Sequence, residues 1–167
     1  FRLKLSGGRY SQNFTSASND KDVVNLFNGL LSAPTNVQST FVTQFGKTRN
    51  PKNGIQYSWH AIFGGEFDLT KSLLLNVEGY YKYFPQLSNL NTFKNTEDVA
   101  ENSKVDDIYK KEFMIESGQS YGLDVMLKFS KNRLFIWGVY SLAKSTRWNG
   151  FSEYFPVFDR RHNANIV

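Results

Sequence analysis

Residues 55–84 read IQYSWHAIFGGEFDLTKSLLLNVEGYYKYF, and this stretch decides the fold class. Apolar and polar side chains alternate along it, which predicts two strands, over residues 55–68 and 72–84. A short link, residues 69–71, separates the two strands. The stretch therefore predicts an antiparallel hairpin that has one apolar and one polar face.

The same pattern recurs along the rest of the chain. A second hairpin is predicted over residues 114–130 and 134–145, joined by the short link 131–133. Residues 1–12 and 161–167 also alternate and predict two further strands. Both faces of the 134–145 segment are apolar, so the sequence leaves the orientation of that strand open.

Long polar connections separate these elements, over about residues 13–54, 85–113 and 146–159. Short turns on one side and long loops on the other are typical of an outer-membrane β-barrel. The predicted fold class is therefore all-β: an antiparallel transmembrane β-barrel segment of about six strands with long extracellular loops. Because single-chain barrels begin at about eight strands, we expect residues 1–167 to be a fragment of one barrel domain. Both ends fall inside predicted strands, so we expect a longer parent chain.

Strand length and aromatic content favour a membrane setting. Alternation over nine or more residues matches a tilted membrane strand of about 9–11 residues, whereas soluble strands average about five or six. Aromatic residues make up 16% of the chain and fall near the ends of the apolar faces, where interfacial girdles lie, at Tyr57, Phe67, Tyr81, Tyr83, Tyr121 and Phe129. The same aromatics could fill a soluble core, so a soluble β-sandwich binding module remains an alternative.

Two local patterns depart from plain strand alternation. Residues 20–31 carry apolar side chains at helical spacing and predict a short helix inside the longest loop. The run Asp159-Arg160-Arg161-His162 is predicted to anchor the last strand through charged hydrogen bonds, with an anion site or a proton relay as the alternatives.

Several classes of function find no support in the residues. The net charge is +5, but the basic residues are scattered, so nucleic-acid binding is not expected. The chain has no cysteine, which excludes disulfides and thiolate metal sites within it. Its two histidines, His60 and His162, are isolated and match no metal-ligand spacing. We therefore predict no catalytic residue, no metal, no cofactor and no enzymatic activity.

Three motifs and one hairpin carry a family resemblance. Residues 118–124 read GQSYGLD, residues 139–145 read VYSLAKS and residues 155–163 read FPVFDRRHN. The hairpin that begins with HAIFGGEF at residue 60 precedes them. In this order and spacing, they resemble the late barrel region of TonB-dependent outer-membrane receptors of the Bacteroidetes type, over roughly residues 55–167.

The resemblance implies a plugged barrel of about 22 strands in the outer membrane of a Gram-negative bacterium. Such a transporter imports its ligand with energy from the inner membrane. The partners implied are outer-membrane lipid and lipopolysaccharide, the TonB complex through an N-terminal region outside this chain, and a surface lipoprotein lid. A barrel without transport activity, serving as a structural or assembly subunit, is the alternative within the same fold.

The candidate site residues belong to two groups. On the polar strand faces, we predict that six side chains face the lumen and contact the plug: Glu66, Asn76, Glu78, Lys82, Asp124 and Lys128. Simple solvation of the wall is the alternative for each of them. In the last loop, four aromatic side chains are candidate ligand contacts: Trp148, Phe151, Tyr154 and Phe155. Packing of loop against loop is the alternative for these.

Overall fold

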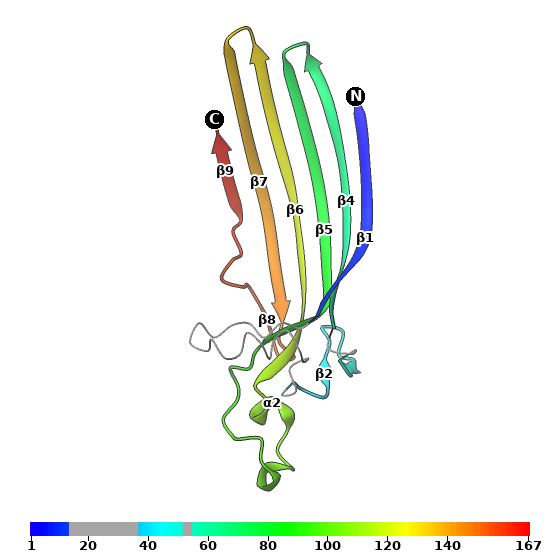
Figure 1. Ribbon diagram of the computed structural model, residues 1–167, viewed down its shortest axis with the longest axis vertical. Helices are drawn as coiled ribbons and strands as arrows, with labels where there is room; N and C mark the ends of the chain where they lie inside the picture. Colours follow the sequence, from blue (N-terminus) through cyan, green and yellow to red (C-terminus); the bar gives the residue numbers. More distant parts are fainter. Residues whose placement is uncertain (14–36, 52–54) are drawn as a thin grey trace.

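The computed structural model describes residues 1–13, 37–51 and 55–167, which are mostly antiparallel β-sheet (Figure 1). The main sheet has seven strands, with β8 and β9 both pairing with β7: β1 (Arg2–Asn13), β4 (Ile55–Thr70), β5 (Leu73–Leu90), β6 (Phe113–Lys131), β7 (Leu134–Trp148), β8 (Glu153–Tyr154) and β9 (His162–Ile166). The first five of these lie side by side in chain order. The all-β prediction is confirmed, and each of the six predicted strands is present.

The remaining described elements are short and lie in the long connections. A two-stranded ribbon is formed by β2 (Phe41–Val42) and β3 (Thr48–Arg49). The second connection holds the 3-10 helix η1 (Ala100–Asn102) and the single-turn helix α2 (Asp107–Lys110). No helix in the described ranges has the length and apolar character needed to cross a lipid bilayer. The helix predicted over residues 20–31 lies outside the described residues.

Tight turns close one end of the sheet, and the long connections leave from the other end (Figure 1). Between β6 and β7, Asn132 has a φ of 53°. This left-handed conformation is one that Asn adopts more readily than most residues, so it suits the turn. The layout predicted from the loop lengths, with short turns at one end only, is therefore present in the fold.

Two strands, β5 and β7, run farthest beyond the ends predicted from the sequence. The strand was predicted to end at residue 84, just before Pro85, and proline cannot donate a ladder hydrogen bond. The structure instead continues β5 to Leu90, with a shift in register between Phe84 and Leu87 that takes up the proline. Likewise, β7 continues to Trp148. These extensions carry the sheet past its regular region and into the loop layer.

The register gives the sheet two distinct faces. Residues paired directly across an antiparallel ladder share a face, and one such row runs across six strands through Leu5, Phe63, Gly79, Leu123, Leu142 and His162. We call this side the apolar face. The adjacent row, on the opposite side, runs through Lys4, Gly64, Glu78, Asp124, Ser141 and Asn163, and we call that side the polar face. The register also orients β7, placing Leu142 on the apolar face and Ser141 on the polar face.

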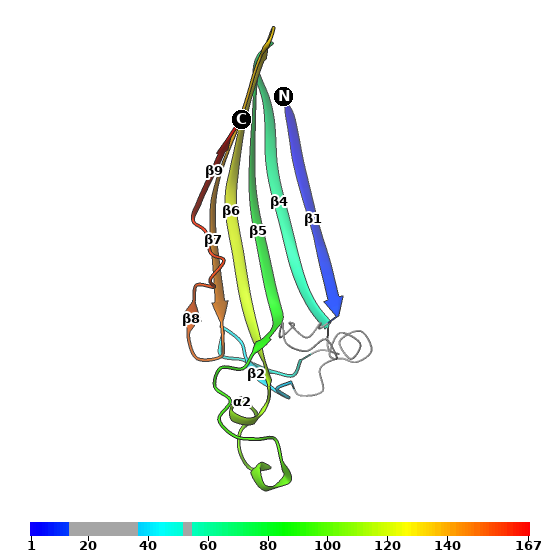
Figure 2. The same ribbon diagram turned by 60° about the vertical axis from the view of Figure 1, so that its left-hand side comes forward.

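No second layer covers the apolar face among the described residues, and the sheet is one layer thick (Figure 2). Leu5 is 85% exposed and Phe63 is 62% exposed on this face. The buried hydrophobic side chains of the described part are Phe41, Met114 and Ile115, all at the loop end. The strands are thus held by their backbone ladder rather than by a core beneath the sheet.

Two glycines on opposite faces of the sheet should respond differently to substitution. A Cβ at Gly122 would lie 2.6 Å from the Leu142 carbonyl oxygen and 2.8 Å from Tyr80 Cζ, whereas a Cβ at Gly79 would meet nothing closer than 3.9 Å. We predict that Gly122→Ala lowers the free energy of unfolding by about 1–3 kcal/mol, and that Gly79→Ala changes it little. Urea unfolding of the two variants checks this, and equal stability of both would contradict it.

Candidate functional site

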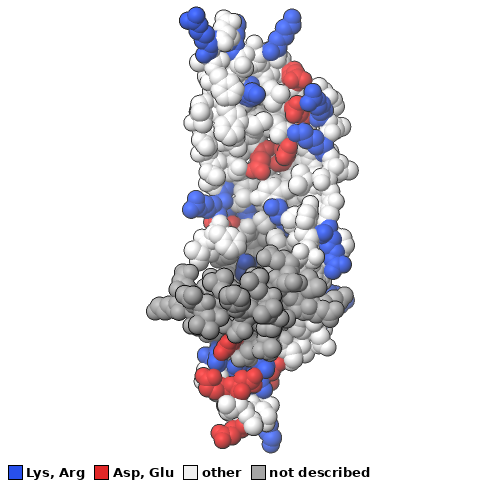
Figure 3. All heavy atoms as spheres, viewed as in Figure 1, with Lys and Arg blue, Asp and Glu red and all other residues white. Residues whose placement is uncertain are grey.

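The polar face brings together the six side chains that were predicted to point into a lumen. Glu66 pairs directly with Asn76, and Glu78 pairs directly with Asp124. Lys82 and Lys128 lie on the same face, opposite Ser120 and Leu74 respectively. Figure 3 shows acidic and basic side chains gathered over the strands on this face. That the face lines a lumen and contacts a plug stays a prediction.

An ion-pair network joins β1, β4 and β5 on the polar face. Lys4 Nζ lies 3.5 Å from Glu66 Oε2 and 3.3 Å from Glu78 Oε1. Arg2 Nη1 lies 3.5 Å from Glu66 Oε1, and Asn76 Nδ2 donates to Glu78 Oε1 at 3.1 Å. The network holds the first strand against its neighbours through side chains as well as through the backbone.

One carboxylate beside this network, that of Asp124, has no cationic partner among the described residues. Asp124 lies directly opposite Glu78, and like charges in that position repel. Within the described ranges, Asp124 forms no ion pair. The two lysines of the predicted group instead lie over aromatic rings, Lys82 over Tyr80 and Lys128 over Phe135. The middle of the polar face can therefore accept hydrogen bonds or cations from a partner.

Glu116 forms a buried polar cluster where the sheet meets the loops. This carboxylate is 2% exposed. It accepts hydrogen bonds from Tyr154 Oη at 2.8 and 2.9 Å, from Asn89 Nδ2 at 3.2 Å and from Arg147 Nη1 at 3.3 Å. The four residues come from β5, β6, β7 and β8, so the cluster ties the third connection to the sheet.

Sequence reasoning missed Glu116 and gave Tyr154 a different role. Glu116 precedes the regular alternation of its strand, and nothing local marks it as buried. Its partner Arg147 lies beyond the predicted end of β7, so the sequence did not place the two together. Tyr154 is half-buried with its hydroxyl on Glu116; burial, then this hydrogen bond and the negative charge, raise the pKa of Tyr154.

A cleft of about 460 Å³ opens between the three long connections. It is lined by residues from all of them, including Phe41, Asp107 and Phe151. Ser39 donates two hydrogen bonds to Asp107 Oδ2, from its backbone N–H at 2.9 Å and from its hydroxyl. Burial pushes the pKa of Asp107 upward, but these bonds and the nearby lysines outweigh it and lower the pKa, so the group is ionised at neutral pH.

The aromatic residues predicted as ligand contacts are spread over this loop layer. Trp148 Nε1 donates to the Val42 carbonyl oxygen at 3.0 Å, which joins the first and third connections. Phe151 lines the cleft with its ring 5.4 Å from that of Phe93. Phe155 is 57% exposed. Trp148 and Phe151 thus make the loop-to-loop contacts that were the alternative to ligand binding, and their binding of a ligand stays a prediction.

The two histidines lie in different strands and serve local contacts. His60 Nε2 shares a hydrogen bond of 2.9 Å with Ser58 Oγ, and His162 Nδ1 shares one of 2.7 Å with Tyr140 Oη. In residues 1–13, 37–51 and 55–167, no group of three or more His, Asp or Glu could hold a metal ion. The run Asp159–His162 was predicted to anchor the last strand through charged hydrogen bonds, and the structure shows such bonds at Asp159, which accepts from Ser145 N at 2.7 Å and from Arg161 Nε at 2.8 Å.

Removal of the Glu116 carboxylate should weaken the junction of sheet and loops. In Glu116→Ala, Arg147 and the Tyr154 hydroxyl lose a buried partner, which costs about 1–3 kcal/mol. The matched control is Glu112→Ala, since Glu112 has a side chain that is 54% exposed, and surface changes stay within about 0.5 kcal/mol. Urea unfolding of the two variants measures the difference, and a Glu116→Ala effect no larger than the control would contradict a role for the cluster.

Three features of the described residues bear on function: the charged polar face, the Glu116 cluster and the cleft between the loops. The polar face lies on the strands, the Glu116 cluster lies where the sheet meets the loops, and the cleft lies between the long connections. No protein-family model matches the chain, and the comparisons with curated proteins and with solved structures found no match.

Proposed function

We propose that this chain forms part of the wall of a β-barrel in a bacterial outer membrane, within a TonB-dependent transporter that imports a ligand. The observation that carries the proposal is the apolar face of a single-layer sheet, which no other described residues cover and whose opposite face is charged. Soluble proteins rarely expose a continuous apolar patch larger than a few hundred Å². A lipid bilayer is the environment in which such a face is stable.

The dimensions of the sheet fit a membrane band. From Tyr121 to Phe129, the apolar side chains of β6 extend over about 27 Å of strand. A tilt of about 40° reduces this to a height of about 20 Å, close to the apolar band of about 25 Å on outer-membrane barrels. Exposed cations bound the band at the turn end, where Lys71 and Lys131 lie, and tyrosines bound it at the loop end.

The sheet edges support a larger closed structure. Among the described residues, the outer edges of β1 and β9 pair with no strand. Lipid does not tolerate unpaired backbone N–H and C=O groups. Further strands, from the same chain or from other protomers, would satisfy these edges, and the family resemblance favours a barrel of about 22 strands.

The remaining surfaces suit a plugged transporter. Asp124, which lies on the polar face and forms no ion pair within the described ranges, would hydrogen-bond a plug inside the barrel. The long connections would lie outside the cell, where the cleft could admit a ligand or face a lipoprotein lid. TonB would act through the plug and not through this wall, so transport as such rests on the resemblance.

Cell fractionation followed by mass spectrometry of the intact native polypeptide tests this function. We expect an outer-membrane protein several times larger than 19.2 kDa, with plug and TonB-box peptides upstream of Phe1. An outer-membrane barrel without those peptides would favour a structural or assembly subunit. A soluble product would overturn both barrel proposals in favour of a β-sandwich binding module.

The two faces of β6 should differ in their access to lipid. Residues 1–167 contain no cysteine, so single cysteines carrying an environment-sensitive fluorophore can be placed in this region once any cysteine elsewhere in the parent protein is replaced. We predict that labels at Leu123, Val125 and Leu127 are quenched by spin-labelled lipids, because these positions lie on the apolar face. Labels at the intervening controls, Asp124, Met126 and Lys128, should resist that quenching. Uniform quenching along the strand, or none at all, would contradict a membrane wall.

A further inference from the structure

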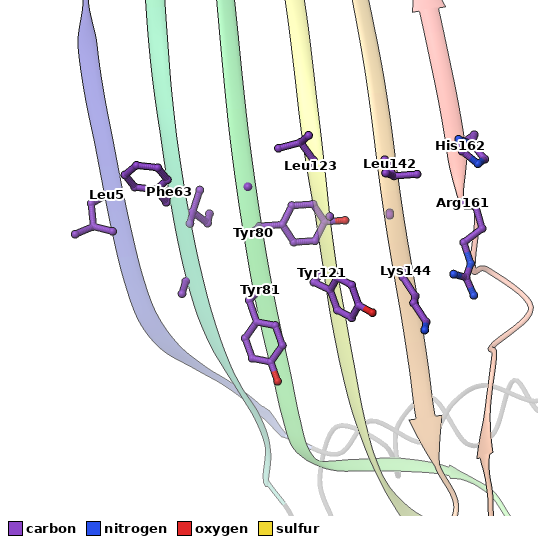
Figure 4. A pocket seen from close by; sticks show the side chains of 15 residues that line it. Leu5, Phe63, Tyr80, Tyr81, Tyr121, Leu123, Leu142, Lys144, Arg161 and His162 are labelled. Carbon is purple, nitrogen blue, oxygen red and sulfur yellow. The ribbon is translucent and has the colours of Figure 1, made fainter.

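The cleft between the long connections has a lining whose formal charges cancel. It is separate from the open groove of about 780 Å³ on the apolar face (Figure 4), which belongs to the proposed membrane wall. The charged residues that line the cleft are two lysines and two aspartates, Lys104, Lys110, Asp106 and Asp107, so the formal charge of the lining is zero. A residue of the lining that gains one charge therefore sets the sign of the cleft.

Asn149 and Gly150 line this cleft, in the turn between β7 and β8. In an asparagine–glycine pair, the backbone nitrogen of the glycine can attack the side-chain amide of the asparagine, because glycine has no side chain to hinder the approach. Gly150 has a φ of 98°, and nothing lies within 4 Å of the position that a Cβ would occupy. The surroundings of the pair thus leave room for the reaction.

The hydrogen bonds of the turn favour this attack. Asn149 Oδ1 accepts from Phe151 N at 3.0 Å and from Ser152 N at 2.9 Å. These donors polarise the amide carbonyl and would hold the negative charge that develops on Oδ1, as the donors of an oxyanion hole do. Neither Asn149 Nδ2 nor Gly150 N donates a hydrogen bond to another described residue. The leaving group and the nucleophile are therefore both free.

Asn149 is the only asparagine followed by glycine among the described residues. The two other such pairs of the chain, at residues 28–29 and 53–54, lie outside them. Asn91 offers a contrast in the same loop layer, because its Oδ1 also accepts a backbone hydrogen bond but its Nδ2 donates to the carbonyl oxygens of Ile108 and Lys111. The next residue is Thr92, whose branched side chain crowds the backbone nitrogen.

We propose that Asn149 is a site of spontaneous deamidation, which turns the neutral cleft into an anionic one. Gly150 N loses its proton to hydroxide and attacks Asn149 Cγ, and the carbonyl electron pair moves to Oδ1. The intermediate then collapses and expels Nδ2, which takes a proton from water and leaves as ammonia, so that a succinimide remains. Water adds to either imide carbonyl and breaks its bond to nitrogen, which gives aspartate or isoaspartate. In total, water is consumed, ammonia is released and an amide becomes a carboxylate.

The two products change the cleft in different ways. The aspartate product would keep both backbone donors and strengthen their bonds through its charge. Its carboxylate would attract a cationic ligand and repel an anionic one. The isoaspartate product would add one atom to the backbone of the turn and displace Phe151, whose ring lies 5.4 Å from that of Phe93. Both changes concern the loop layer, and neither depends on the barrel proposal.

Peptide mapping by mass spectrometry of the full-length protein, aged at mildly alkaline pH, tests the site. One sample is kept folded, and a second is unfolded in urea, which removes the two backbone donors. A hydrogen bond to a charged oxygen is roughly twice as strong as one to a neutral carbonyl. We therefore expect Asn149 to deamidate about tenfold faster in the folded sample than in the unfolded one. Enzymatic methylation of isoaspartate would count the second product.

Two controls accompany the measurement. Asn91 should stay intact in the folded sample, because its leaving group is held by two carbonyl oxygens. The matched variant is Asn149→Gln, since glutamine must close a larger and less favoured ring, and it should remove the mass gain from this peptide.

Two results would overturn the inference: deamidation of Asn149 that is no faster in the folded sample than in the unfolded one, or a folded-state rate no higher than that of Asn91. Either result leaves the barrel proposal untouched, because cell fractionation decides that proposal separately. Faster deamidation in the folded sample would support the site whether or not the protein is found in the outer membrane.

Discussion

The continuous antiparallel ladder from β1 to β7 is the constraint on which the rest of the structure depends. Within the described residues, strand pairing supplies nearly all of the contacts between the long strands, because no core lies beneath them there and the apolar face is open. The ladder also determines which side chains lie on the same face of the sheet. Since directly paired residues share a face, the register alone aligns Leu5 with His162 across six strands on one side, and Lys4 with Asn163 on the other.

The loop end follows a different principle. There, Met114 and Ile115 are fully buried and Glu116 is enclosed by donors from three neighbouring strands. The sheet thus changes along its length from a two-faced wall to a small packed base that carries the connections. The Glu116 cluster and the hydrogen bond from Trp148 to Val42 lie in this base. They attach the loops that line the cleft to the sheet.

The proposed membrane wall follows from the way the two faces of the sheet differ. A face that is apolar over most of its length, and that ends in tyrosines and then in Lys144 and Arg161, reproduces the order of a bilayer from tails to headgroups. The polar face repeats none of this order, and four of its charged side chains form an ion-pair network across β1, β4 and β5. Lipid on one side and protein or water on the other account for both faces together.

The sequence by itself determined the all-β class, the six main strands and the two faces of β4, β5 and β6, because strand alternation has a period of two and is local. It also placed Asp159 as an anchor, and the six charged or polar residues of the polar face. Tertiary structure alone decided the orientation of β7, the passage of β5 through Pro85, and the meeting of Glu116 with Arg147 and Tyr154. These features depend on which residues lie opposite each other across the ladder. The alternation within a single strand does not reveal how that strand pairs with a distant one.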